Sequence, residues 1–247
     1  MSKIALVTGG GSGIGLACAR TLAANDFFVI ITGRRLALLK EAQEAIGEAN
    51  CTAIACDITE PDEVDSLYAQ IENEHKRLDV LFNNAGNNVS AAPVGDVSVA
   101  DFQNIINVNV VGAFSCARGA FNLMRKQSPQ GGRIINNGSI SAAVPRPGSA
   151  PYTASKHAIT GLTRCISLDG RPYNIACGQI DIGNTASDMT TQMGSGVPQA
   201  DLSIKAEPVM DVQHVADSVA HMANLPLSAN VQFMTVMATN MPFIGRG

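Results

Sequence analysis

Two side chains that could exchange a proton stand four residues apart in the stretch YTASK, at Tyr152 and Lys156. Residues 151–168 have helical spacing, so both side chains are predicted to lie on one helix face. A phenol with a pKa near 10 is a poor base at neutral pH, and lowering that value by about 3 units takes about 4 kcal/mol. One ammonium group at about 4 Å contributes on the order of 4 kcal/mol at an effective dielectric constant of about 20. The pair therefore fits a proton donor and acceptor, although a half-buried Tyr beside a Lys stem has the same sequence.

A second candidate for chemistry is the glycine-rich stretch VTGGGSGIG at residues 7–15. It joins an apolar run at 4–7, predicted to be a buried strand, to a predicted helix at 14–22. Such a turn binds phosphate, because free N–H groups and the helix dipole converge at the helix N-terminus. The spacing is Gly9-xxx-Gly13-x-Gly15 rather than GxGxxG, so a purely structural turn is the alternative. The chain contains neither a Gly-Lys pair nor a GxSxG motif, which excludes the common P-loop and the nucleophile elbow.

The elements that must position these residues alternate between strand and helix patterns along the whole chain. Short runs rich in Ile and Val, buried on both faces and separated by helices, indicate a parallel sheet with right-handed crossovers. We therefore expect one doubly wound α/β domain over residues 1–247, with about seven strands and helices on both faces. The predicted strands are 4–7, 27–32, 52–56, 80–83, 133–137, 174–177 and 231–236. The predicted helices are 14–22, 36–46, a helix opened by a capping box at 59–62, a long one from the box at 98–101 to about 127, 151–168 and 212–222.

Further short motifs follow the glycine loop in a fixed order. They are GRR at 33–35, CDIT at 56–59, NNAG at 83–86, NVN at 107–109, NGS at 137–139 and YTASK at 152–156. With this order and spacing, about the first 165 residues resemble the short-chain dehydrogenase/reductase family. The resemblance implies a Rossmann fold and an NAD(P)-dependent oxidoreductase that interconverts a secondary alcohol and a ketone by hydride transfer.

The resemblance also implies roles for four catalytic residues. Tyr152 would transfer the proton, and Lys156 would favour the phenolate and hold the cofactor ribose. Ser139 would orient the substrate oxygen, and Asn109 would hold a water that relays protons towards the lysine. Two alternatives stay open in the sequence: Ser139 as a plain turn residue, and Asn109 as a plain polar helix residue, with the neighbouring Asn107 competing for its role.

The cofactor contacts implied by the family are spread over the carboxyl ends of the predicted strands. Asp57 would accept a hydrogen bond from the adenine amino group, or it is only a residue at a helix start. The NNAG turn would lie under the adenosine ribose, and Thr185 would contact the nicotinamide carboxamide. The full predicted set is Gly9, Ser12, Gly13, Ile14, Gly15, Arg34, Arg35, Asp57, Ile58, Asn84, Ala85, Gly86, Tyr152, Lys156 and Thr185.

The residues after the second predicted strand favour NADP(H) over NAD(H), with NAD as the second possibility. An NAD enzyme has an acidic residue there to bind the ribose 2′-hydroxyl, whereas this chain has Gly33. Arg34 follows, and its guanidinium suits a 2′-phosphate. Arg35 would help by stacking on adenine. Ser12 stands where some NADP-using relatives carry a second basic residue, so the preference is expected to be modest. The alternative is that both arginines only solvate the next helix.

The chain departs from the family pattern after the sixth strand. Ile180 and Asp181 stand where a Pro-Gly pair is expected, which leaves the backbone path at 178–185 open. Residues 186–208 are irregular, with Ser, Gly and Thr among apolar residues, and this composition suits a lid over the substrate. The resemblance implies a homotetramer or homodimer built on the helices at 100–127 and 151–168.

Composition narrows the remaining classes of function. The net charge of −4 argues against nucleic acid and anionic membranes as partners, and no apolar run reaches the length of a membrane span. No signal peptide is visible, and the six scattered cysteines fit buried free thiols, so a cytoplasmic location is expected. The four histidines have no ligand spacing, and no catalytic metal is predicted. The rival functions are a dinucleotide-binding regulatory protein without turnover and an epimerase or dehydratase that uses the cofactor transiently.

Overall fold

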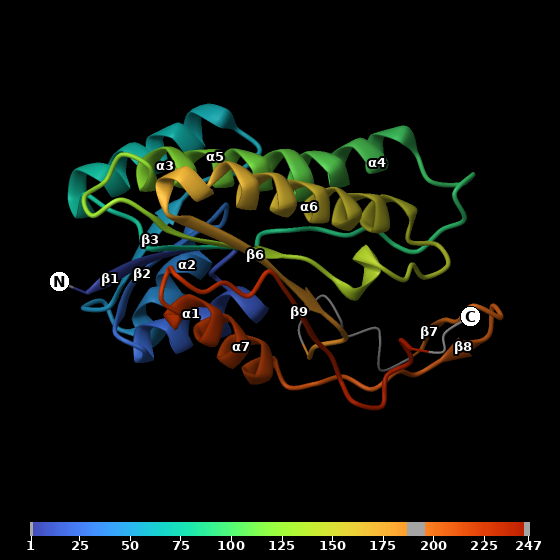
Figure 1. Ribbon diagram of the computed structural model, residues 1–247. Helices are drawn as coiled ribbons and strands as arrows, with labels where there is room; N and C mark the ends of the chain where they lie inside the picture. Colours follow the sequence, from blue (N-terminus) through green and yellow to red (C-terminus); the bar gives the residue numbers. More distant parts are fainter. Residues whose placement is uncertain (1, 187–195, 245–247) are drawn as a thin grey trace.

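A central sheet of seven parallel strands organises the computed structural model, which describes residues 2–186 and 196–244. The strands lie in the order β3-β2-β1-β4-β5-β6-β9 (Figure 1). Strand order reverses between β1 and β4, which is where doubly wound sheets bind ligands. The bounds are β1 Lys3–Thr8, β2 Phe27–Gly33, β3 Cys51–Ala55, β4 Val80–Asn83, β5 Gly132–Asn137, β6 Ile175–Ile182 and β9 Phe233–Val236. The predicted fold class is confirmed.

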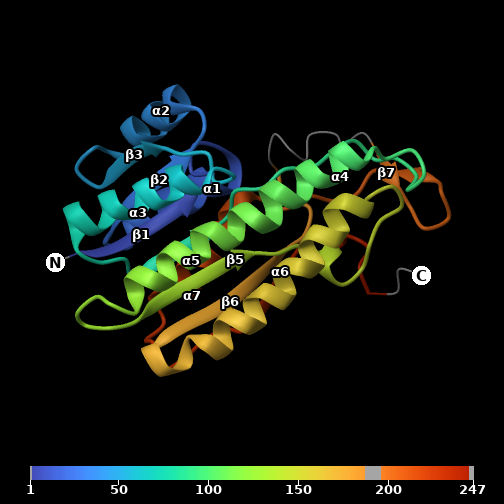
Figure 2. The ribbon, with the colours of Figure 1, turned by 90° about the horizontal axis from the view of Figure 1, so that it is seen from above.

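Helices cover both faces of this sheet (Figures 1 and 2). One layer holds α1 Gly13–Ala24, α2 Leu36–Ile46 and α7 Val212–Asn224. The other holds α3 Pro61–His75, α4 Val99–Ile106, a π-helix Asn107–Gly112, α5 Ala113–Met124 and α6 Ala150–Asp169. Viewed from above, α4 and α5 form one long rod that runs beside α6 (Figure 2). Short 3-10 helices cover Ile140–Ala142 and Arg171–Tyr173, and β7 Val197–Pro198 pairs antiparallel with β8 Ile204–Lys205.

Each face of the sheet has its own hydrophobic core. Ala5 and Val7 of β1 pack under α1, α2 and α7, whereas Ile4 and Leu6 pack under α3 and α5. Side chains alternate along a strand, so a strand buried on both sides needs an unbroken apolar run. This requirement explains why the sequence pattern locates the strands well.

The structure corrects three predicted boundaries. The sixth strand extends to Ile182 rather than ending at 177, and the last strand begins at Phe233 rather than 231. The capping box at 59–62 is wrong, because Glu60 precedes the first turn of α3 without a side-chain cap and Thr59 donates instead to Asp57. The box at 98–101 is confirmed, since Ser98 Oγ accepts from the Asp101 N–H at 3.0 Å.

Candidate active site

The glycine loop after β1 is shaped by close backbone contacts. Gly9 and Gly13 have φ values of +66° and +51°, a region that L side chains rarely adopt. A Cβ on Gly15 would overlap the carbonyl of Gly9 and lie 2.7 Å from Asn84 Nδ2. Helix α1 begins at Gly13, directly after Ser12, with no side-chain cap and no acidic residue in its first turn. Its free N–H groups and positive dipole end therefore suit an anion.

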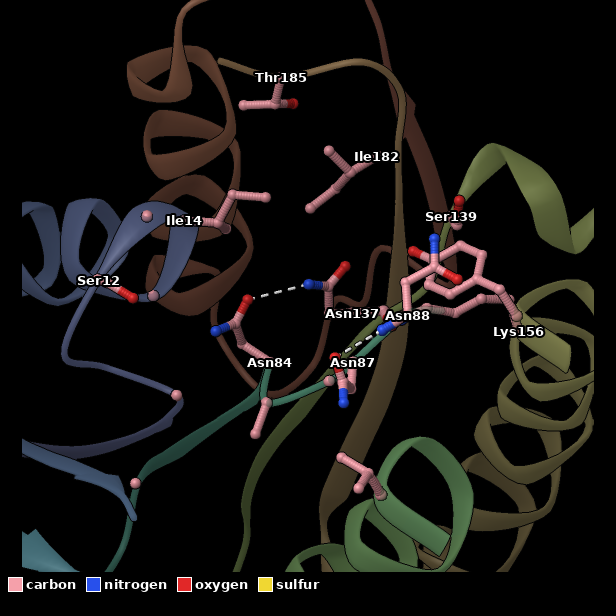
Figure 3. Close-up of a pocket in the computed structure, with 18 of the residues that line it drawn as sticks. Ser12, Ile14, Asn84, Asn87, Asn88, Asn137, Ser139, Lys156, Ile182 and Thr185 are labelled. Atoms are coloured by element: carbon pink, nitrogen blue, oxygen red, sulfur yellow. Dashed lines mark hydrogen bonds between the residues drawn. The ribbon is translucent and has the colours of Figure 1, made fainter. Parts of the chain in front are cut away.

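The turn after β4 holds the glycine loop in place through hydrogen bonds. Thr8 Oγ1 accepts from the backbone N–H groups of Asn84 and Ala85, both at 2.9 Å. The Asn84 carboxamide donates to Thr8 O at 2.9 Å. It accepts from Asn137 Nδ2, also at 2.9 Å (Figure 3). These bonds link the ends of β1, β4 and β5 at one edge of the sheet. Gly86 lies close to Asn109, since a Cβ on Gly86 would be 3.3 Å from Asn109 Oδ1.

β2 and β3 bring further polar residues to the same side of the sheet, where the carboxyl ends of the strands lie. Arg34 and Arg35 follow β2 and line the cleft, and Gly33 leaves open space, because the nearest atom to its Cβ would be 3.9 Å away. Asp57 follows β3, where its Oδ1 accepts from the Thr59 N–H at 3.0 Å and from Thr59 Oγ1 at 2.8 Å. These bonds fix the Asp57 carboxylate, and Ile58 beside it also lines the cleft.

The opposite end of the cleft holds the proton-exchange pair and the serine. Lys156 is 5% exposed, its Nζ donates to Asn137 O at 2.8 Å, and it lies 5.4 Å from the centre of the Tyr152 ring. Ser139 follows β5 and is 6% exposed, and its Oγ accepts from the Ser141 N–H at 3.1 Å. Figure 3 shows Ser139 and Lys156 across the cleft from Ser12 and Ile14 of the glycine loop. The arrangement suits one long ligand that reaches from the loop to the Tyr-Lys pair.

Asn109 is buried and joins three elements at this end of the cleft. Its Oδ1 accepts from the Asn87 N–H at 2.7 Å, and its Nδ2 donates to Asn87 O at 2.9 Å and to Ser155 Oγ at 3.1 Å. It lies in the π-helix, a bulge that frequently occurs at functional sites. Asn107 is exposed instead. Asn109 does not itself line the cleft, but it holds the backbone of Asn87, which does.

The residues at the expected Pro-Gly position are part of a regular strand. Ile180 and Asp181 pair in register with Met234 and Thr235 of β9, which settles the backbone path that the sequence left open. Asp181 Oδ1 accepts from Gln179 Nε2 at 2.7 Å and from the Ser139 N–H at 3.0 Å. Burial raises the pKa of the Asp181 carboxyl, and these bonds and the charge of Lys156 lower it by less.

This shift predicts how stability varies with pH. Because the folded-state pKa of Asp181 lies above its unfolded value, ionisation of Asp181 lowers the free energy of unfolding as pH rises through and above about 4. We expect Asp181→Asn to melt at a higher temperature than the wild type at neutral pH. The difference should shrink at pH values below the Asp181 pKa, where the carboxyl is neutral. Thermal melts of both proteins from acid to neutral pH measure it, and a variant of lower Tm at neutral pH would contradict it.

A largely buried ion pair lies beside the cleft, which Arg146 lines. Arg146, from the loop before α6, contacts Glu207 Oε2 at 2.5 Å and Asn184 Oδ1 at 2.8 Å. Asn184 Nδ2 also donates to Glu207, at 2.7 Å, and Thr185 next to it lines the cleft. These contacts tie the segment after β6 to the loop before α6. Part of the predicted lid, residues 187–195, lies outside the described residues.

Possible metal ligands, apolar helices and cysteines complete the description of the residues that the structure covers. No three His, Cys, Asp or Glu side chains there are grouped to hold a metal ion, and none of the described helices is long and apolar enough to cross a membrane. All six cysteines are free, and Cys165 alone is exposed. Burial raises the pKa of the Cys56 thiol to about 11 and of Cys51 and Cys177 to about 12, so none of these three is a ready nucleophile.

One cleft of about 600 Å³ is lined by every predicted site residue except Asn109. The predicted residues that line it are Gly9, Ser12, Gly13, Ile14, Gly15, Arg34, Arg35, Asp57, Ile58, Asn84, Ala85, Gly86, Ser139, Tyr152, Lys156 and Thr185. The sequence reasoning missed Asn87, Asn88 and Arg146, which line the same cleft, and the contact of Asp181 with Ser139. The run NNAGNN carried a signal for the two asparagines, because it extends a recognised motif with the same residue type.

Comparisons with known proteins agree with this architecture. A family model described as short chain dehydrogenase matches residues 3–197. A 3beta-hydroxysteroid dehydrogenase of Mediterraneibacter gnavus is 32% identical over 209 residues, which cover 83% of this chain and 74% of that protein. A (+)-cis,cis-nepetalactol synthase of Nepeta racemosa is 32% identical over 238 residues, covering 94% and 87%. The solved structure of ElxO with NADP bound is 27% identical, has a TM-score of 0.85 and covers 96% of this chain and 97% of its own.

These matches and the strand order of the sheet agree with each other. The family model spans the region from β1 to β7 and includes the glycine loop, the NNAG turn, Ser139 and the Tyr152–Lys156 pair. The chain therefore belongs to the short-chain dehydrogenase family.

Proposed function

We propose that the chain is an NAD(P)-dependent oxidoreductase that interconverts a secondary alcohol and a ketone by hydride transfer. The observation that carries the proposal is one cleft with the glycine loop and the start of α1 at one end and Ser139, Tyr152 and Lys156 at the other. Bound nicotinamide dinucleotide would supply a hydride acceptor in oxidation and a hydride donor in reduction. Among the relatives, the name 3beta-hydroxysteroid dehydrogenase and the NADP-bound ElxO structure support this class.

The residues of the cleft fit such a cofactor. Glycines at 9, 13 and 15 leave the backbone bare where a pyrophosphate would approach the start of α1. Lys156 Nζ, fixed by Asn137 O, is placed to hold a ribose hydroxyl and to stabilise the phenolate of Tyr152. Ser139 would orient the substrate oxygen by a hydrogen bond. In oxidation Tyr152 would take the hydroxyl proton as hydride leaves the carbinol carbon, and in reduction it would return that proton.

A screen of the purified protein against a panel of ketones tests this proposal. The loss of NAD(P)H absorbance is the readout. Oxidation of NADPH with at least one ketone is the expected result. Two rivals have other signatures. A regulatory protein would bind cofactor and turn over nothing, but such a protein has no need of the Ser139–Tyr152–Lys156 set. An epimerase or dehydratase would convert a substrate without net change in NAD(P)H. The relative named nepetalactol synthase, which is not named as a dehydrogenase, supports this second candidate function.

Arg34 is proposed as the main determinant of a preference for NADP(H). Gly33 leaves room for a 2′-phosphate, and the Arg34 guanidinium is a planar donor suited to it. A charge-assisted contact of about 1.5–3 kcal/mol corresponds to a roughly tenfold to hundredfold preference. We expect Arg34→Ala to erase that preference in kcat/KM measured with NADPH and NADH. Arg125 directly follows α5 and is not among the residues that line the cleft, so Arg125→Ala is the matched control. Equal use of both cofactors by the wild type would contradict the assignment.

A homodimer or homotetramer built on the α4–α5 rod and α6 is the proposed assembly. Its support is a set of exposed apolar side chains on these helices, with Phe102 39% exposed, Val111 44%, Phe114 50% and Leu168 57%. Exposed aromatic rings are costly in a monomer, and their burial favours association. We expect Phe114→Glu to lower the molar mass measured by light scattering, whereas Val94→Glu, in a loop outside these helices, should leave it unchanged. A monomeric wild type would overturn this proposal.

Three smaller expectations complete the proposal. The free cysteines suit a reducing compartment, so we place the protein in the cytoplasm. A small alcohol or ketone is the expected partner, and neither nucleic acid nor a membrane is. Residues 186–208 are proposed to cover the substrate, and the Arg146–Glu207 contact would hold the end of this lid against the cleft.

A further inference from the structure

Two polar side chains project from the second half of β6, where a buried parallel strand is usually apolar. Gln179 and Asp181 are two residues apart and therefore point to the same side of the sheet, towards α6. Gln179 is fully buried, and its amide contacts Thr160 Oγ1 at 3.0 Å, Thr163 Oγ1 at 3.1 Å and Asp181 Oδ1 at 2.7 Å. Burial of such groups is unfavourable unless every polar atom is paired. Two of the three partners of Gln179, Thr160 and Thr163, lie on α6, the helix that carries Tyr152 and Lys156.

Asp181 and Lys156 bind the two ends of the same three-residue stretch, 137–139, where β5 ends. Lys156 Nζ donates to the carbonyl of Asn137, and Asp181 Oδ1 accepts from the N–H of Ser139, two residues later. Gly138 lies between them, and a Cβ there would overlap Asp181 Oδ1 and crowd Gln179. The glycine of the NGS motif therefore makes room for this carboxylate.

The electrostatic surroundings of Asp181 are simple. Lys156, on α6, is the charged group whose field acts on Asp181. The other hydrogen-bond partners of Asp181 are uncharged: Ser139, which follows β5, and Gln179 of β6. Thr235, the register partner on β9, is uncharged too. An asparagine would keep one oxygen to accept both hydrogen bonds without a buried charge. The property that distinguishes the Asp181 carboxylate from an asparagine amide is therefore its negative charge near Lys156.

We propose that Asp181 is a positioning residue of this active site: its carboxylate holds the Ser139 backbone in place, and its charge offsets part of the Lys156 field at Tyr152. The inference rests on the proposed function, because it concerns the same proton transfer. Removal of the charge leaves the field of Lys156 less opposed. The phenolate of Tyr152 then forms at lower pH, so alcohol oxidation begins at lower pH.

A substrate-free experiment measures this effect directly. The chain contains three tyrosines and no tryptophan, so phenolate absorbance is unobscured by indole. Burial raises the pKa of Tyr68 well above its ordinary value, and subtraction of a Tyr152→Phe titration removes the signals of Tyr68 and Tyr173. The midpoint pH of the remaining Tyr152 signal is compared between the wild type and Asp181→Asn, each with its own Tyr152→Phe reference. We expect the midpoint to fall by about 0.5–1 pH unit in Asp181→Asn.

A remote charge change serves as the matched control. Asp65→Asn removes the same charge from an exposed carboxylate on α3, whose ion pair with Arg118 is solvent-accessible. Its midpoint should equal that of the wild type, because exposed charges are screened by salt. An unchanged midpoint in Asp181→Asn, or an equal fall in Asp65→Asn, would overturn the role of the Asp181 charge.

Turnover separates the positioning role from the charge. Asp181→Ala removes the acceptor for the Ser139 N–H, whereas Asp181→Asn keeps one. With any ketone that the wild type reduces, we expect Asp181→Ala to lose at least about tenfold in kcat/KM and Asp181→Asn to recover most of that loss. Equal kcat/KM in Asp181→Ala and wild type would overturn the positioning role. If Asp181→Ala does not fold, the titration of Asp181→Asn still decides the proposal, and if no ketone is reduced, the proposed function fails while the titration remains valid.

Discussion

Replacement of Tyr152 by Phe is expected to keep cofactor binding and to lower turnover by about 10²- to 10⁴-fold, the usual contribution of a general acid or base. The reason is that Phe keeps the ring, with its contact to Lys156, and removes the one hydroxyl that would carry the proton. Steady-state kcat with a reduced ketone measures the loss, and the shift of Tm on addition of NADPH measures the binding that should remain.

The control for this change is another tyrosine outside the cleft. Tyr173 lies in the 3-10 helix before β6, and its ring packs edge-on against Phe121 with centroids 5.7 Å apart. Tyr173→Phe also removes one hydroxyl and should leave kcat unchanged. Turnover of Tyr152→Phe within about threefold of the wild type lies far outside the expected range and would remove Tyr152 from the proton-transfer role.

The fold was predictable because its main determinants are local. Strands such as β2 are buried on both faces, so nearly every residue is apolar and the run stands out between helical patterns. β6 was predicted too short for the same reason. Gln179 and Asp181 break its apolar run, and the partners that make them tolerable, Thr160, Thr163 and Ser139, lie in other elements. A single sequence does not reveal such long-range pairs.

The candidate site also has a part that the sequence predicts and a part that it does not. The cofactor end depends on motifs in which the residue type is decisive, such as glycines that leave the backbone bare, and these all line the cleft. The choice between Asn107 and Asn109 depends instead on the π-helix, which changes which residues face inwards and has no clear sequence signature. The Arg146–Glu207 contact joins residues 61 positions apart, so only the folded chain brings it into view.

Gly15→Ala is expected to impair both stability and cofactor binding, although Ala is the better helix former. A Cβ at position 15 would overlap the Gly9 carbonyl and crowd Asn84 Nδ2, both part of the braced loop. Overpacking of this kind costs about 1–3 kcal/mol, and the neighbours here are backbone atoms that cannot rotate away. Displacement of the loop also moves the N–H groups at the start of α1. If this displacement removes hydrogen bonds to the dinucleotide that contribute about 1.5–3 kcal/mol, the Kd for NADPH rises roughly tenfold to hundredfold.

Gly161→Ala is the matched control, because it makes the same change inside another helix. Gly161 is exposed within α6, and beyond the backbone of its own helix its Cβ would meet no atom of the same protomer within 4 Å. There the change should stabilise the protein by about 0.5–1 kcal/mol, the difference in helix propensity between Gly and Ala. Thermal melts and NADPH titrations of both variants separate the effects: Tm should fall and Kd rise for Gly15→Ala, while Tm rises and Kd stays constant for Gly161→Ala. Unchanged NADPH affinity in Gly15→Ala would mean that the dinucleotide does not depend on the glycine loop, which would remove the main support for the proposed cofactor site.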